Sequence, residues 1–369
     1  QGKQASSISI TTNKKNIISI VIPEFVSQGG PRVVINIANI LAENGYKVHI
    51  IACRKPEKKI PFFVSPLVTL HYATKFNNKV IAYLVFPFIL PFILSGDILI
   101  STYYYVRLPT KLAAYFKKIP HFYFIQGVEC FRKGGLLNIL NSLCKISLYE
   151  ENIFASNKYL SNEVFNKTGR KINHINVGPS TIFFSKQLSV EQKEYDLIYF
   201  PRKENFKRLD LFLDLFSNSE FVEKKWKIIM VTQDSLLALD LKNMMLPFCE
   251  IISPADDDEL IHLIDQSKLM FFTSEYEGLG LPPLEAMARG LPVVTYKTYP
   301  LTEYFSSNEL SNLLVEDTLS AVSVINEILA SNEKYLHYSN LCKEFVQSAF
   351  SENYALEFND YIQNNRSEK

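Results

Sequence analysis

The stretch that decides the fold spans residues 277–294, EGLGLPPLEAMARGLPVV, between apolar segments expected to form strands at 269–273 and 292–295. Its glycines and prolines predict a tight turn that leads into a helix. Because a helix begins with unpaired N–H groups and a positive dipole end, this strand–turn–helix unit favours a bound phosphate. Glu277 and Glu285 add carboxylates suited to hydroxyl groups. The pattern therefore indicates a nucleotide sugar, which carries both phosphates and hydroxyls.

Length and composition narrow the remaining possibilities. The chain has 369 residues, more than one domain of about 100–200 residues usually contains, so we expect two domains. A formal net charge of +1 gives no global field for nucleic acid, and we expect no nucleic-acid partner. The five cysteines are scattered without a CxxC pair, and the histidines lack metal-binding spacing, which predicts neither disulfides nor zinc. Residues 1–14 are polar and unlike a secretory signal, so we expect a cytoplasmic protein.

Strand and helix patterns alternate along the chain. Apolar runs predict first-half strands at 17–22, 47–52, 97–101, 121–125 and 154–155, and a helix with its apolar residues between 33 and 41. The pattern restarts in the second half, with strands at 195–200, 226–232 and 250–252 and a helix at 257–266. Strands separated by helices indicate parallel sheets with right-handed crossovers. The fold class is therefore α/β, with two Rossmann-like, doubly wound domains that face a cleft.

The domain limits follow from where this periodicity is lost. Residues 178–194 are polar and aperiodic, which is typical of a linker. We expect an N-terminal acceptor domain at 1–180 and a C-terminal donor domain at 181–350. The amphipathic segment at 351–363 predicts a final helix that packs back on the first domain.

Ligands of doubly wound sheets bind beyond the carboxyl ends of the strands, and one loop there is strongly basic. The loop after the strand at 195–200 contains Arg202, Lys203 and Lys207. Taken alone, it could be a solvated basic loop. Together with the glycine turn, it predicts cations that stabilise the negative charge growing on a diphosphate leaving group.

The second half resembles the retaining, nucleotide-sugar-dependent glycosyltransferases of family four, which have the GT-B fold. Their E-x7-E signature is similar to YEGLGLPPLEAMARG at 276–290. The resemblance implies that Glu277 contacts the donor sugar and Glu285 the ribose hydroxyls. It also implies that Gly278, Leu279 and Gly280 offer backbone N–H groups to the phosphates and the sugar.

The remaining site residues also follow from this resemblance. Arg202 and Lys207 match the family's GR-x4-K pair for the donor phosphates, although Pro201 replaces the glycine and Lys203 could compete for the same role. Gly29 and Gly30 resemble the glycine loop of the first domain.

A histidine that many members place near the donor sugar is absent from this chain. Gln126 stands at the corresponding place; it can hydrogen-bond there but cannot act as a general base. Glu129 is the nearest carboxylate and a weak candidate for the acceptor side.

Two further patterns have competing interpretations. Tyr103 and Tyr104 follow a first-domain strand and could either stack on acceptor sugars or pack in the core. Residues 256–258, DDD, look like a metal-binding DxD motif, but their place just before a helix favours capping. We therefore expect no metal, and no cofactor beyond the donor as co-substrate.

The predicted function is transfer of a hexosyl or deoxyhexosyl group from a nucleotide-diphosphate donor to a glycan or lipid-linked acceptor. The pathway would be bacterial surface-polysaccharide or cell-wall glycan synthesis. The resemblance implies retention at the anomeric carbon without a metal. Rival predictions are a non-catalytic glycan-binding or partner subunit and a nucleotide-sugar epimerase.

The apolar segment from Val80 to Leu94 bears on whether the protein lies at a membrane surface. It is too short to span a membrane and is interrupted by Pro87 and Pro91. It predicts either a buried helix or intersubunit face, or a wedge at the inner face of the plasma membrane, aided by nearby basic residues. These are Lys111, Lys117, Lys118, Arg132 and Lys133.

Overall fold

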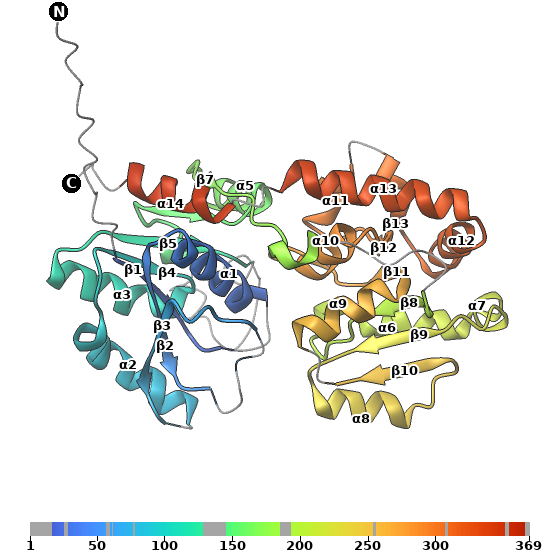
Figure 1. The fold of residues 1–369 in the computed structure, drawn as a ribbon, viewed down its shortest axis with the longest axis horizontal. Helices are drawn as coiled ribbons and strands as arrows, with labels where there is room; N and C mark the ends of the chain where they lie inside the picture. The colour runs from blue at the N-terminus through green and yellow to red at the C-terminus, as the bar shows by residue number, and fades with distance from the viewer. Residues whose placement is uncertain are drawn as a thin grey trace, which may run out of the picture.

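The computed structural model describes residues 17–25, 29–56, 60, 62–76, 78–127, 145–184, 193–253, 256–306, 309–350 and 354–365. Two parallel sheets, each flanked by helices, form two lobes that lie side by side (Figure 1). The predicted α/β class is therefore confirmed.

The first sheet has the strand order β3-β2-β1-β4-β5-β6-β7, and every pairing is parallel. Its strands are β1 (Ile17–Ile22), β2 (Lys47–Arg54), β3 (Val68–Thr74), β4 (Ile98–Ser101), β5 (His121–Ile125), β6 (Ile153–Ala155) and β7 (Asn173–His174). The edge strand β3 is not among the predicted strands. It is half-buried along most of its length, so its sequence lacks the continuous apolar run of β1.

Helices cover both faces of this sheet. They are α1 (Gly29–Glu43), α2 (Lys79–Ile93), α3 (Tyr104–Lys117) and α5 (Lys158–Thr168). The last helix of the chain, α14 (Tyr354–Asn364), lies on this lobe beside α1 (Figure 1). Its Phe358 packs edge-on against Phe124 of β5 and Phe154 of β6, so the end of the chain completes the core of the first lobe.

The second sheet repeats the pattern with the order β10-β9-β8-β11-β12-β13. Its strands are β8 (Tyr195–Tyr199), β9 (Ile228–Val231), β10 (Cys249–Ile252), β11 (Ser267–Phe272), β12 (Val293–Tyr296) and β13 (Leu314–Val315). The helices around it are α6 (Leu209–Leu213), α7 (Ser219–Glu223), α8 (Ser235–Asn243), α9 (Asp257–Asp265), α10 (Leu281–Ala288), α11 (Leu301–Phe305), α12 (Thr318–Leu329) and α13 (Asn332–Ala349). Asp256 caps α9 by accepting a hydrogen bond from the backbone N–H of Glu259, at 2.9 Å, as the capping interpretation predicts.

Helix α2 is only partly buried, so the expectation of a buried helix is wrong, whereas an intersubunit face and a membrane wedge stay predictions. Ala82, Phe86 and Leu90 face the core. The opposite side of the helix is exposed and still apolar. Its exposed residues are Val80, Ile81, Leu84, Phe88 and Phe92. Among the described helices, none is both long and apolar enough to cross a membrane.

Both sheets reverse their strand order next to the first strand, between β1 and β4 and between β8 and β11. Loops at such a switch point diverge and leave a crevice at the carboxyl ends of the strands, which is where doubly wound folds bind ligands. In the first lobe, Gly29 follows β1, Tyr103 follows β4 and Gln126 follows β5. In the second lobe, the basic loop follows β8 and the glycine turn follows β11.

Candidate functional site

A cavity of about 290 Å³ lies between the two lobes, lined by loops from both switch points. This volume is close to the lower end of ligand pockets in proteins, roughly 300 Å³. Most of the residues singled out in the sequence line it: Gly29, Gly30, Tyr103, Gln126, Arg202, Lys207, Glu277, Gly278, Leu279, Gly280 and Glu285.

Two of the sequence candidates lie outside the cavity lining. Lys203 points to the carboxylates of Asp234 and Asp240, at 3.9 and 3.6 Å, and does not line the cavity, which gives no support to its suggested competition for the phosphates. Tyr104 packs edge-on against Tyr105 outside the cavity, as in the core-packing interpretation. Glu129 lies outside the described residues.

The glycine turn is held tightly against the first lobe. Gly280, just before α10, has a left-handed φ of 70°. A residue with a side chain adopts this φ only at a cost in free energy. A Cβ at Gly278 would stand 2.3 Å from the backbone oxygen of Gln126. Asn157, the N-cap of α5, donates a hydrogen bond to the Gly278 carbonyl at 2.7 Å. The glycine turn, which belongs to the second lobe, is thus held by contacts with the first lobe.

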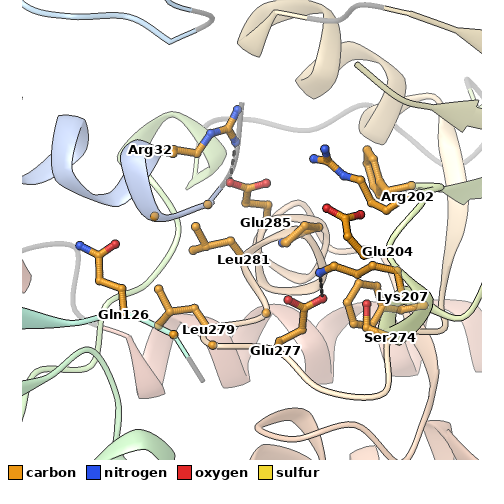
Figure 2. Close-up of a pocket in the computed structure, with 18 of the residues that line it drawn as sticks. Arg32, Gln126, Arg202, Glu204, Lys207, Ser274, Glu277, Leu279, Leu281 and Glu285 are labelled. Atoms are coloured by element: carbon orange, nitrogen blue, oxygen red, sulfur yellow. Dashed lines mark hydrogen bonds and ion pairs between the residues drawn. The ribbon is translucent and has the colours of Figure 1, made fainter. Parts of the chain in front are cut away.

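Lys207 and Glu277 form an ion pair inside the cavity, with 2.6 Å between Nζ and Oε1 (Figure 2). The short helical turn that carries Lys207 is fixed to the end of β11 by two hydrogen bonds. The hydroxyl of Thr273 donates to the Lys207 carbonyl at 2.8 Å, and the N–H of Glu275 donates to the Phe206 carbonyl at 2.7 Å. The cation from one loop and the carboxylate from the other are therefore positioned before any ligand arrives.

Glu285 has a partner that the sequence analysis missed. Arg32 of α1, in the first lobe, donates to its carboxylate at 2.6 Å, and the second nitrogen of the guanidinium pairs with Asp257 of α9. All three side chains are largely buried. The sequence does contain a signal for this contact, because Arg32 lies two residues after the glycine pair on an otherwise apolar helix segment.

The positive charge of Arg32 is stabilised by Glu285 and Asp257. Burial lowers the pKa of its guanidinium, but the Glu285 and Asp257 carboxylates outweigh burial and raise it overall. For Asp257, burial is the dominant influence and raises the pKa of the carboxyl group, against the opposing charge of Arg32. The buried guanidinium of Arg32 is therefore held in its charged form between the carboxylates of Glu285 and Asp257, which belong to the second lobe.

Arg202 and Glu204 line the opposite side of the cavity and extend toward the region between Glu285 and Lys207 (Figure 2). Arg202, Lys207 and Arg32 give the cavity cations on both sides of the α10 N-terminus, whereas Glu204 adds a carboxylate. The cations can hold a ligand with two phosphate groups, together with backbone N–H groups of the glycine turn, because Pro282 and Pro283 at the start of α10 have no N–H.

Gln126 lies deep on the first-lobe side of the cavity. Gln126 is 7% exposed, and neither its amide oxygen nor its amide nitrogen has a hydrogen-bond partner among the residues that the structure describes. A Cβ at Gly30 would stand 3.0 Å from the Gln126 oxygen and 2.8 Å from the Tyr103 hydroxyl. A buried amide without partners is costly, so this position suits a ligand hydroxyl group.

The second lobe matches a known protein family. Residues 180–347 match the family described as "Glycosyl transferases group 1". A segment of 40 residues is 52% identical to "Putative glycosyltransferase ORF378" of Acidianus filamentous virus 2 (isolate Italy/Pozzuoli), but this match spans only 11% of either chain.

Solved structures resemble the whole chain. Sucrose-phosphate synthase from Thermosynechococcus elongatus has a TM-score of 0.76 at 14% identity, and covers 95% of this chain and 99% of its own. Anabaena Alr3699/HepE in complex with UDP and glucose has a TM-score of 0.71 at 13% identity, with 95% and 100% covered. Likenesses at such identity show the fold alone, and that fold is the expected GT-B arrangement.

Proposed function

We propose that this chain, a GT-B protein whose residues 180–347 form a glycosyl transferases group 1 domain, transfers a sugar from a nucleotide-diphosphate donor to an acceptor hydroxyl. The observation that carries the proposal is the Lys207–Glu277 ion pair at the start of α10, with Arg202 lining the same cavity. Residues 181–350 would hold the donor, and residues 1–180 the acceptor.

The roles of the residues follow from their places. Arg202, Lys207 and the N-terminus of α10 stabilise the diphosphate as the bond between the sugar and its phosphate oxygen breaks. Glu277 holds Lys207 and accepts hydrogen bonds from the donor sugar, while Glu285 binds the ribose. Because the cavity lies between the lobes, their contact excludes water that would otherwise hydrolyse the donor.

The stereochemistry belongs to the same proposal. We place the chain in the retaining family four, with a hexosyl or deoxyhexosyl group transferred. The acceptor oxygen attacks the face from which the diphosphate leaves, and its proton passes to the departing phosphate oxygen. Gln126 serves as a hydrogen-bonding partner in this step, because an amide cannot take up the proton.

The test combines binding and turnover. In a thermal-shift screen against UDP, GDP and ADP, one of the three should raise the melting temperature, since a ligand at about 100 times its Kd adds roughly 2.7 kcal/mol of stability.

Lys207→Met should then reduce sugar transfer about 10- to 100-fold, because a charged hydrogen bond contributes about 1.5–3 kcal/mol. Lys203→Met is the matched control, since Lys203 lies outside the cavity. Equal losses in the two variants would contradict the site assignment.

We further propose a lipid-linked acceptor at a membrane surface that contains anionic lipid. Helix α2 exposes an apolar stripe with Leu84, Phe88 and Phe92 at 67%, 75% and 88% exposure. Helix α3, which contacts α2, exposes Leu112 and further apolar residues. Neither helix contains an acidic residue, and both contribute lysines. An exposed apolar set beside cations suits insertion among anionic headgroups.

Flotation with vesicles tests the membrane proposal. The chain should float with phosphatidylglycerol-containing vesicles and remain behind with phosphatidylcholine alone. Phe88→Ser with Phe92→Ser should abolish flotation. Met245→Ser changes an equally exposed apolar residue of the second lobe, 86% exposed, and should leave flotation unchanged. Unaltered flotation of the double variant would overturn the assignment of this surface.

A further inference from the structure

Arg32 connects the two lobes at the edge of the cavity. It belongs to α1 of the first lobe, and its guanidinium contacts α10 and α9 of the second. The group lies over the rings of Phe62 and Phe183, at 4.9 and 5.8 Å from their centroids. Its two terminal nitrogens are bound to different carboxylates, so the guanidinium plane has little freedom to turn.

Glu285 is equally constrained. It is 3% exposed, and one of its oxygens is bound to Arg32 at 2.6 Å. The second oxygen is turned away from Arg32, toward the side of the cavity that contains Arg202 (Figure 2). One charged hydrogen bond anchors Oε1 of Glu285 to the guanidinium, so Arg32 restricts where the second oxygen points.

We propose that Arg32 is a positioning residue for recognition of the donor ribose: it holds Glu285 so that the free carboxylate oxygen meets a ribose hydroxyl. This inference rests on the proposed function and deepens it. Because Arg32 comes from the first lobe, the ribose site in the second lobe is complete only when the lobes are in contact. Nucleotide binding and closure of the cleft are then linked through one ion pair.

The alternative is a purely structural tether, in which Arg32 joins the lobes without influence on the ribose. The two roles differ in one measurable quantity. Binding through Glu285 should discriminate a ribonucleotide from its deoxy analogue, because a site built to bond a hydroxyl group is left with a buried unpaired carboxylate when that hydroxyl is missing. A tether would change the affinity for both nucleotides by the same factor.

The experiment is calorimetric titration of the full chain with UDP, GDP and ADP and with their 2′-deoxy and 3′-deoxy forms. For the nucleotide that binds, we expect the wild-type chain to prefer the ribose form by about tenfold or more. Arg32→Gln should bring this ratio close to one, and Glu285→Gln should do the same. The double variant should lose no more than either single variant, since both act on one contact.

Two further variants guard against loss of folding. Arg32→Lys keeps the charge without the planar fork, and should recover only part of the ratio. Arg54→Gln removes another buried arginine of the first lobe, paired with Glu24 at 2.8 Å and remote from the cavity lining, and should leave the ratio at the wild-type value. Circular dichroism confirms that each variant is folded.

The outcomes separate this inference from the function on which it rests. If Arg32→Gln and Arg32→Lys keep the wild-type ratio while Glu285→Gln loses it, Arg32 is a tether and the inference is wrong, although the function stands. A folded wild-type chain that binds a nucleotide without ribose preference also overturns it. If the chain binds no nucleoside diphosphate, the proposed function itself fails.

Discussion

Gly278 leaves no space for a side chain between the two lobes. A Cβ there would meet the backbone oxygen of Gln126 at 2.3 Å and the Cα of Gly127 at 3.0 Å, and neither is the end of a flexible side chain. The carbonyl of the same residue is bound by Asn157 at 2.7 Å. The position of the glycine turn is therefore set by the backbone of Gln126 and Gly127 and by the Asn157 side chain, and a single methyl group must displace it.

We expect Gly278→Ala to reduce sugar transfer about 100-fold while the chain remains folded, because a shift of about 1 Å in a catalytic group can cost that much. Gly29→Ala changes another glycine of the cavity lining and should cost much less, because its Cβ would stand 3.4 Å from a methyl group of Leu281, which is ordinary contact. Initial-rate measurements with the donor found by the thermal-shift screen compare the two. Similar rates for both alanine variants would show that the turn is free to move.

At the scale of single residues, the sequence predicts the site residues that lie in loops with a recognisable local pattern. Glu277 and Lys207 lie in loops of distinctive composition, and the structure places them 2.6 Å apart. Arg32 could not be assigned in the same way, because its partners are 225 and 253 positions away along the chain. The sequence marks Arg32 as an unusual charge on an apolar segment, but a long-range ion pair leaves no periodic pattern, so only the packing of the two lobes identifies its partners.

At the scale of helices and strands, a buried ion pair joins the ends of α9 and α10. Arg289 follows α10, is 2% exposed, and binds Asp265 at the end of α9 through two nitrogens, one of them at 2.8 Å. This ion pair joins α9 to α10, and α10 also carries Glu285, which lines the cavity. The stability of these helices is thus connected to the placement of the site residues that they carry.

Arg289→Leu should lower the free energy of unfolding by about 3–5 kcal/mol, because it leaves the Asp265 carboxylate buried without its partner. Adding Asp265→Leu should recover much of this loss, since two apolar side chains of similar volume leave no buried charge. Urea denaturation followed by circular dichroism measures both variants. A double variant as unstable as the single one would contradict this explanation.

Glu24 connects the end of β1 to β2 and α2 through Arg54 and Lys79, at 2.8 and 2.7 Å. Burial raises the pKa of Glu24, but hydrogen bonds from Lys79 and Arg54 outweigh it and the pKa is lowered from 4.5. A depressed pKa of a carboxyl group means that the folded state prefers the charged form. Its contribution to stability is therefore present above about pH 4.5 and is lost as the pH falls through the lower, folded-state pKa.

Glu24→Gln should consequently be less stable than the wild-type chain at pH 7, and the difference should diminish below pH 4.5 as Glu24 of the wild type becomes protonated. Urea titrations at several pH values measure this difference. Glu316→Gln removes an exposed carboxylate and serves as the control, with little change at any pH. A difference that stays constant down to acid pH would show that packing, and not charge, accounts for the effect.

Elements differ in how well their sequences predict them. The strand predicted at 121–125 agrees with β5, whose apolar residues are buried on both faces. The predicted helix at 257–266 agrees with α9 because its acidic first turn and apolar side are both local signals. Helix α2 is apolar on every side, so its sequence could not say which face is exposed; contacts with the sheet and with α3 decide that.

At the scale of the whole molecule, the chain crosses from the second lobe back to the first. Helix α13 runs along the second lobe, and α14 then lies on the first beside α1 (Figure 1). Phe358, 1% exposed, and Ile362, fully buried, belong to the core that β1, β5 and β6 form with α1. The first lobe therefore depends on the last residues of the chain for part of its core.

Phe358→Ala should destabilise the first lobe by about 3–5 kcal/mol, the usual cost of emptying a buried phenylalanine site. The loss should be local, because Phe358 packs on Phe124 and Phe154 and is absent from the core of the second sheet. Hydrogen exchange measured by mass spectrometry should show faster exchange in β5 and β6, with β11 and β12 unchanged. Glu357→Ala, at the exposed neighbouring position, should alter neither sheet. Equal loss of protection in both sheets would mean that the two lobes unfold as one unit, and that α14 stabilises the second lobe as strongly as the first.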